Sequence, residues 1–185
     1  MPSDLLPFLL AHLGKESCLI LSGEIGAGKT HAAEDLVTAL KESGFAVGGV
    51  LSPRIVQDGE TVGYTVRDLA TDEERPFAVL TTPGVRVGKF FIAEEGLTFA
   101  CGAIERAAEH AQVVFVDEVG WLELAGGGLA PALRVLLRSA ALPILLVRSA
   151  FVDVVACTFA VAPFKELAVQ QEIALLGSER KAQNG

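Results

Sequence analysis

Apolar residues occur in two alternating patterns along the first part of the chain. Cys18–Leu21 is continuously apolar, which is typical of a strand buried on both faces of a parallel sheet. In Lys29–Ser43 the apolar residues instead recur at helical spacing on one side, and Gly44 follows as a residue that commonly ends a helix. A second apolar run, Phe45–Leu51, predicts another strand. The order strand, glycine-rich loop, helix and strand is that of the βαβ unit of a parallel sheet.

The segment Arg54–Phe91 has a different pattern. Thr61–Val66 alternates between apolar and polar positions, and Asp58–Gly59 before it is a turn signal, so we predict a β-hairpin here. Val79–Leu80 and Val85–Ile92 have the composition of further strands. The middle of the chain therefore predicts an antiparallel extension of the sheet.

The remaining elements continue the alternation of helices and strands. We predict strands at Val113–Val116 and Ile144–Val147, and helices at Ser3–Leu13, Leu97–His110, Leu129–Ser139 and Lys165–Leu176. No linker, internal repeat or low-complexity tract divides the sequence, so we expect residues 1–185 to form one domain, with 178–185 as a polar, flexible tail. The predicted fold class is α/β, with a mainly parallel sheet and an antiparallel hairpin extension.

Composition and charge narrow the classes of protein. Of the residues, 51% are apolar and 21% are charged, so the chain is expected to bury a core. The longest uncharged runs, Ser43–Pro53 and Val154–Phe164, are much shorter than the ~20 apolar residues that a membrane-spanning helix needs. The net charge of −8, with no basic cluster, disfavours binding to nucleic acid. Cys18, Cys101 and Cys157 lie far apart among apolar neighbours, which indicates reduced thiols in a soluble, cytoplasmic protein without a secretory signal.

One motif carries a specific chemistry. Gly23–Thr30 matches the phosphate-binding loop G-x-x-x-x-G-K-[ST], known as Walker A, at every position. The loop follows a predicted strand and opens a predicted helix, so its backbone N–H groups are expected to form an anion site. Lys29 would place a positive charge between the β- and γ-phosphates, and the Thr30 hydroxyl would bind Mg²⁺. The residues predicted to bind the nucleotide are Gly23, Glu24, Ile25, Gly26, Ala27, Gly28, Lys29, Thr30 and His31.

Two acidic residues directly follow the predicted strand Val113–Val116. Asp117 and Glu118 stand where ligands bind in parallel α/β sheets, outside the carboxyl ends of the strands. At this Walker B position Asp117 would reach the Mg²⁺ held by Thr30, and Glu118 would orient or deprotonate an attacking water. Alone, an acidic pair is more often a helix cap or a solvated surface feature. Together with a complete phosphate loop upstream, the pair predicts a metal-binding and a water-activating residue.

Phosphoryl transfer also uses cations beyond the loop lysine. Arg54 follows a predicted strand and Lys89 lies in a glycine turn, so both are candidates for contacts with the γ-phosphate. Arg67, Arg75 and Arg86 lie in the same span. For each of these residues the plain alternative is a solvated surface cation.

Several segments together resemble the THEP-type P-loop nucleoside-triphosphatase family. The resemblance covers residues 17–165 and is carried by Gly23–Thr30, Gly48–Arg54, Val62–Ala70, Val87–Phe90 and Asp117–Leu124. It implies a RecA-like three-layer sandwich in which an extra strand separates the phosphate-loop strand from the Asp117 strand. It also implies a Mg²⁺-dependent NTPase with broad base tolerance, in which Glu118 activates water.

The chain departs from the pattern of this family at three places. His31 stands where a second Thr or Ser is common, and Trp121 stands where a lysine is usual. Ser52–Pro53 replaces the usual Thr and acidic residue. By the resemblance, His31 replaces a residue that contacts the α-phosphate, and Trp121 replaces a cation that could face the phosphates. The departures therefore imply weaker turnover than in typical members or a specialised partner.

We therefore predict a hydrolase that converts ATP and other NTPs to NDP and phosphate, with Glu118 and Lys29 as catalytic residues and Mg²⁺ as cofactor. Two alternatives stay open. A nucleotide or small-molecule kinase uses the same loop with an acceptor hydroxyl in place of water. A nucleotide-dependent binding or cofactor-assembly protein hydrolyses little without its protein partner. The predicted partner is the nucleotide, and a protein partner stays unidentified.

Overall fold

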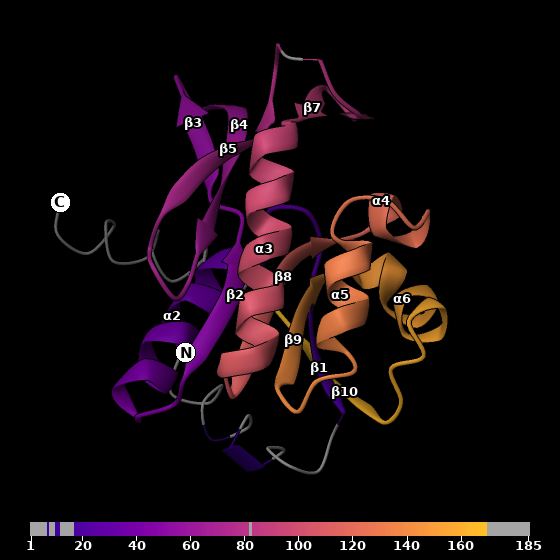
Figure 1. The fold of residues 1–185 in the computed structure, drawn as a ribbon. Helices are drawn as coiled ribbons and strands as arrows, with labels where there is room; N and C mark the ends of the chain where they lie inside the picture. The colour runs from indigo at the N-terminus through magenta and orange to yellow at the C-terminus, as the bar shows by residue number, and fades with distance from the viewer. Residues whose placement is uncertain (1–6, 8–9, 12–16, 82, 170–185) are drawn as a thin grey trace, which may run out of the picture.

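The computed structural model describes residues 7, 10–11, 17–81 and 83–169 of the chain (Figure 1). Most of the predicted helix Ser3–Leu13 and all of the predicted tail 178–185 lie outside the described residues. The predicted helix Lys165–Leu176 is described only as far as residue 169. The glycine loop and both acidic residues of the second motif lie inside the described range.

The part of the sheet that carries the glycine loop is parallel. Its strands follow one another in the order β10 (Phe164–Ala168), β1 (Cys18–Ser22), β9 (Leu142–Val147), β8 (Val113–Val119) and β2 (Val47–Leu51). As the family resemblance implied, β9 separates β1 from β8. Because these strands are parallel, their carboxyl ends share one edge of the sheet, which is where α/β proteins bind ligands.

The helix predicted at Lys165–Leu176 is wrong over its described part. Phe164–Ala168 forms strand β10, which pairs in parallel with β1 from Cys18↔Phe164 to Ser22↔Ala168. The spacing of Phe164 and Leu167 fits a helix, but periodicity does not separate helix from strand in so short an apolar run. The unpaired N–H and C=O groups along the edge of β1 decide the outcome, because a strand satisfies them.

Beyond β2 the sheet continues with antiparallel strands, which confirms the predicted extension. β4 (Glu60–Asp68) pairs with β2, and the order runs on through β5 (Glu74–Val79), β7 (Phe90–Ile92) and β6 (Arg86–Val87). β3 (Arg54–Gln57) pairs with β4 to form the predicted hairpin. Asp58 (φ 49°) and Gly59 (φ 80°) make its turn with positive φ angles, as tight hairpin turns require. The extension rises above the helices at the top of Figure 1.

Helices cover both faces of the parallel strands. α2 (Lys29–Glu42) covers the face of β1 that carries Leu19 and Leu21. Its residues Leu36 and Leu40 share a hydrophobic core with these two side chains. Ile20 points the other way, as alternate strand residues must, into a core that α3 (Glu94–His110), α5 (Ala130–Leu136) and α6 (Val152–Thr158) share. In Figure 1, α3 and α5 lie in front of the sheet. The chain thus has the predicted three-layer α/β sandwich.

Short helical segments near the carboxyl edge were not expected from the sequence. α4 (Trp121–Leu124) follows β8, and the 3-10 turn η1 (Ser149–Phe151) leads from β9 into α6. Trp121 and Phe151 pack edge to face, with ring centroids 4.8 Å apart. Each segment is a turn or two long, so hydrophobic periodicity gives little signal for it.

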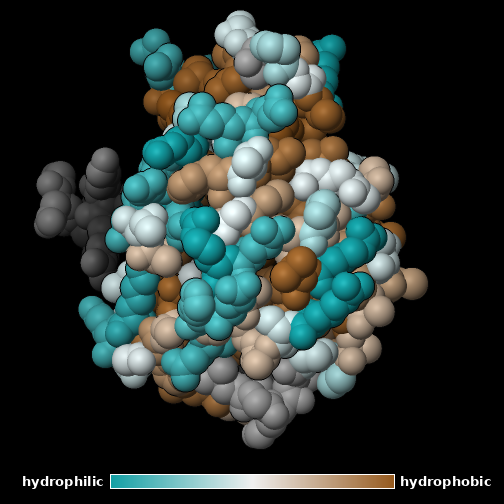
Figure 2. All heavy atoms as spheres, in the orientation of Figure 1, coloured by the Kyte–Doolittle hydropathy of each residue, from teal (hydrophilic) through white to brown (hydrophobic). Residues whose placement is uncertain are grey.

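Figure 2 shows apolar side chains exposed at the end of the molecule formed by the antiparallel extension. The exposed apolar residues of this region are Val56, Leu80, Val85 and Val87. Val56 also borders the site described below, so this end of the sheet adjoins it. Within residues 17–81 and 83–169, every helix is too short or too polar to span a bilayer.

Candidate active site

The glycine loop connects the buried strand β1 to the first turn of α2. Gly26 (φ 79°) and Gly28 (φ 91°) are left-handed, and a Cβ at either position would meet no atom. These glycines are therefore required by the backbone conformation and not by space. Gly28 caps α2 without a side-chain hydrogen bond, so the N–H groups of the first turn remain available to an anion.

Lys29 folds its side chain back over the loop. Its Nζ donates hydrogen bonds to the carbonyl oxygens of Gly23 (2.8 Å) and Glu24 (3.0 Å). Burial lowers the pKa of Lys29, whereas the negative charges of Glu118 and Asp117 act in the opposite direction. The ammonium group is thus held at the loop entrance, where a phosphate oxygen would be a stronger, charged acceptor.

Asp117 is the buried polar centre of the site. Its Oδ2 accepts hydrogen bonds from the Thr30 hydroxyl (2.9 Å) and the Ser52 N–H (3.0 Å), and its Oδ1 accepts one from the Glu118 N–H (2.8 Å). Burial, and secondarily the charge of Glu118, raises the pKa of Asp117 to about 7, although the three hydrogen bonds oppose this rise. A cation bound nearby would restore the charged form, because it would offset the cost of burial.

The oxygen donors around Asp117 fit Mg²⁺. Thr30 and Asp117 offer a hydroxyl and a carboxylate, which are the hard ligands that Mg²⁺ prefers. The hydroxyl of Ser52, beside them, is buried and has no hydrogen-bond partner in the described part of the chain. Within that part, no three His, Cys, Asp or Glu side chains gather into a metal cage. Mg²⁺ commonly keeps several waters and takes further ligands from a phosphate group, so one hydroxyl and one carboxylate are a sufficient set of protein ligands.

Glu118 follows Asp117 in a strained conformation and faces open space. Its φ of 61° lies in the left-handed region, which is uncommon for a residue with a long side chain. The Glu118 side chain is 42% exposed, and its Oε2 lies 3.8 Å from Nη2 of Arg148. The carboxylate therefore stands at the pocket wall, accessible to water.

A pocket of about 390 Å³ joins these groups, within the range of small-molecule sites. It is lined by Ile25, Gly26, Gly28, Lys29, Thr30, His31, Glu34, Ser52, Pro53, Arg54, Val56, Tyr64, Glu118 and Arg148. The hairpin β3–β4 forms one wall, where Arg54 and Tyr64 stand opposite each other in register. The pocket thus brings the glycine loop, Glu118 and Arg54 together, with Asp117 buried behind Thr30.

Other predicted residues lie outside this lining. Gly23, Glu24 and Ala27 belong to the loop backbone without lining the pocket. Lys89 also does not line it, and its Nζ lies 5.3 Å from the centroid of the Phe90 ring.

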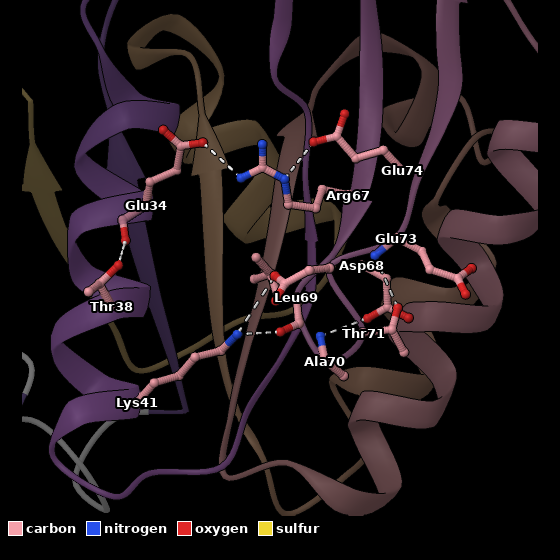
Figure 3. A network of polar contacts seen from close by, with 11 residues as sticks. Glu34, Thr38, Lys41, Arg67, Asp68, Leu69, Ala70, Thr71, Glu73 and Glu74 are labelled. Carbon is pink, nitrogen blue, oxygen red and sulfur yellow. Dashed lines mark hydrogen bonds and ion pairs between the residues drawn. The ribbon is translucent and has the colours of Figure 1, made fainter.

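Arg67 forms ion pairs with the carboxylates of Glu34 and Glu74 (Figure 3). Its Nε donates to Glu74 (2.7 Å) and its Nη1 to Glu34 of α2 (3.3 Å), and these bonds and charges raise the pKa of Arg67. Lys41 lies about two helical turns after Glu34 on α2, and its Nζ donates a hydrogen bond to the carbonyl oxygen of Leu69 (2.6 Å). These contacts tie α2 to the antiparallel extension and leave Arg67 outside the pocket lining.

Arg148 is the residue that our sequence analysis missed. It directly follows the predicted strand Ile144–Val147, so the rule that singled out Asp117 after Val113–Val116 applies to it equally. Tyr64 was noted only within the family resemblance, and burial raises its pKa, followed by the effect of Glu118. Nothing in the sequence signals that the Ser52 hydroxyl is buried without a partner in residues 17–81 and 83–169.

The amino-acid sequence of this chain is similar to those of several known proteins. Two of the similar curated proteins are both named nucleoside-triphosphatase THEP1. The protein from Methanopyrus kandleri is 34% identical over 116 residues, which are 63% of this chain and 64% of the relative. The protein from Thermofilum pendens is 39% identical over 115 residues, which are 61% of this chain and 63% of the relative. The aligned part of this chain thus spans less than two thirds of each of these relatives.

Two solved structures share the fold. A human cancer-related nucleoside triphosphatase superposes with a TM-score of 0.67 at 21% identity, over 90% of this chain and 96% of that chain. THEP1 from the hyperthermophile Aquifex aeolicus superposes with a TM-score of 0.67 at 16% identity, over 91% and 99% of the two chains. The sequence model described as NTPase matches residues 18–165, from the start of β1 into β10. Since this match covers more than half of the chain and includes the glycine loop and Asp117, the chain belongs to the NTPase family.

Proposed function

We propose that this chain is a Mg²⁺-dependent nucleoside-triphosphatase that hydrolyses ATP and other NTPs to NDP and phosphate. The carrying observation is the contact of the Thr30 hydroxyl with the Asp117 carboxylate at the mouth of the glycine loop, with Glu118 on the wall of the same pocket. Two relatives bear the name nucleoside-triphosphatase, which supports the same reaction class.

Each residue has a role in this proposal. The loop N–H groups and Lys29 bind the phosphates and offset their charge in the ground and transition states. Thr30 and Asp117 would hold Mg²⁺, which supplies further charge neutralisation on the transferred phosphoryl group. Glu118 accepts a proton from a water, the water oxygen bonds to the γ-phosphorus, and the bond from that phosphorus to the bridging oxygen breaks. The products are NDP, inorganic phosphate and one proton.

The site also supports proposals about base preference and location. The pocket is lined by loop residues that would contact the phosphates, such as Gly26, Gly28 and Lys29. Because these contacts do not depend on the base, we propose that the protein accepts NTPs with different bases. Cys18, Cys101 and Cys157 are all free thiols, which supports a reducing, cytoplasmic setting.

The test is phosphate release from ATP, GTP, CTP and UTP, each with Mg²⁺ and with a chelator. We expect release from all four nucleotides that stops when the metal is removed. A kinase would release little phosphate from ATP and Mg²⁺ without its acceptor, and a partner-dependent binding protein would bind nucleotide without turnover. Either result contradicts the proposal.

A further inference from the structure

Arg148 directly follows β9, the strand that lies between the two halves of the site. β9 lies between β1 and β8, and its last residue, Val147, pairs with Ser22 on one side and Val119 on the other. Ser22 directly precedes the glycine loop, and Val119 directly follows Glu118. Arg148 therefore leaves the sheet level with the loop entrance and with the proposed water-activating residue.

The Arg148 guanidinium makes few polar contacts within the described part of the chain. Its side chain is 40% exposed and lines the pocket. Among the described residues its one ionic contact is Glu118, at 3.8 Å, which is longer than a hydrogen bond. Its positive charge also contributes to lowering the pKa of Lys29, so its field reaches the loop lysine.

Arg67 and Arg75 differ in this respect, whereas Arg54 lines the same pocket as Arg148. Arg67 donates hydrogen bonds to Glu34 and Glu74, and Arg75 donates to Glu73 (3.2 Å). Neither of these two arginines lines the pocket. Arg148 thus keeps N–H donors available on the wall of the pocket.

We propose that Arg148 contacts the γ-phosphate of the bound nucleotide and exchanges its contact with Glu118 for that contact. This inference rests on the proposed NTPase function. A phosphate group accepts bidentate, charge-assisted hydrogen bonds from a guanidinium, which a contact of 3.8 Å to a carboxylate does not provide. Arg148 forms and breaks no covalent bond in this step.

The first experiment measures binding without turnover. Titration calorimetry with Mg²⁺ compares ADP with a non-cleavable imido analogue of ATP, for the natural chain, Arg148→Ala, Arg148→Lys and Arg138→Ala. We expect Arg148→Ala to weaken analogue binding by about tenfold or more and ADP binding by about twofold or less, since only the analogue carries a γ-phosphate. Arg148→Lys retains part of the preference, because it keeps the charge and loses the planar fork. Arg138→Ala, at an exposed arginine outside the pocket, keeps the natural ratio.

The second experiment measures ATP turnover by the same variants. Arg148→Ala should lower kcat by about 100-fold, in the direction expected for a transition-state cation. An unchanged ratio of analogue to ADP affinity in Arg148→Ala overturns the inference, even if kcat falls, because a residue that only positions Glu118 would give that result. If the natural chain releases no phosphate but loses the analogue preference on substitution, the hydrolase proposal fails and the γ-phosphate contact stands.

Discussion

The hydroxyl of Thr30 donates a 2.9 Å hydrogen bond to Oδ2 of Asp117, although 87 residues separate the two in sequence. Thr30 lies in the first turn of α2, and Asp117 lies near the carboxyl end of β8, with β9 between β8 and the loop strand β1. The contact therefore spans one intervening strand and joins the two motifs into one site. Ser52, at the end of β2, completes the group through its N–H.

We expect Glu118→Gln to lower kcat at least about tenfold and to leave nucleotide affinity nearly unchanged, because the amide keeps the shape and cannot accept the proton from water. Phosphate release and calorimetric affinity for ATP with Mg²⁺ measure the two effects. Glu109→Gln, at an exposed position near the end of α3, is the matched control and should behave like the natural chain. Equal turnover in the two variants would remove Glu118 from its proposed role.

Lys29→Ala should weaken both affinity and turnover, because the ammonium charge acts on the phosphates in the ground and transition states alike. A hydrogen bond to a charged group contributes ~1.5–3 kcal/mol, so we expect affinity to fall by roughly 10–100-fold. Lys41→Ala on the same helix removes a lysine that contacts Leu69 and lies outside the pocket. A similar loss of affinity in both variants would indicate damage to α2 and no specific role for Lys29.

The sequence predicted those parts of the fold in which local pattern and tertiary setting agree. The loop from Gly23 to Thr30, the strand before Asp117 and the hairpin around Asp58–Gly59 each combine periodicity with specific turn or capping residues. The same holds for the proximity of Thr30 and Asp117, which follows from the rule that parallel strands end at one edge of the sheet.

The remaining features depend on neighbours that are distant in sequence. Phe164–Ala168 is a strand because the edge of β1 pairs with it, and nothing in the segment itself requires this. That the Ser52 hydroxyl lacks a partner within the described part of the chain depends on how closely β2, β8 and the loop approach one another. Arg148 follows a predicted strand, so the rule that ligands bind beyond the carboxyl ends of parallel strands could have identified it as a candidate. The sequence alone, however, does not distinguish it from a solvated arginine.

Ser52→Ala separates stability from ligand binding. The serine hydroxyl is buried without a partner among the described residues, which costs about 1–3 kcal/mol, so its removal should maintain or raise the free energy of unfolding of the ligand-free protein. The same change should weaken binding of Mg²⁺ and ATP several-fold, because Ser52 lines the pocket and its N–H contacts Asp117, which leaves the hydroxyl close to the proposed metal ligands. Urea unfolding and calorimetry measure these effects, with Ser43→Ala at the far end of α2 as control. Unchanged affinity in Ser52→Ala would exclude a ligand role for the hydroxyl.

Gly49→Ala tests whether the packing of β2 on β8 fixes the position of Ser52. Gly49 is left-handed (φ 92°), and a Cβ there would overlap the backbone oxygen of Phe115 in β8. Since the clash involves backbone in the middle of the sheet, we expect the free energy of unfolding to fall by about 3 kcal/mol or more. Gly44→Ala is the matched control, because Gly44 is also left-handed (φ 85°) but has open space around its Cβ.

The control substitution should lower the free energy of unfolding by only ~1–2 kcal/mol, the cost of the left-handed conformation itself. Urea unfolding of both variants separates the two contributions, because they share the backbone strain and differ in the clash. Comparable losses would mean that β2 can move away from β8. In that case the Ser52 N–H would not be held rigidly against Asp117, and the geometry around the proposed metal ligands would depend on the bound nucleotide.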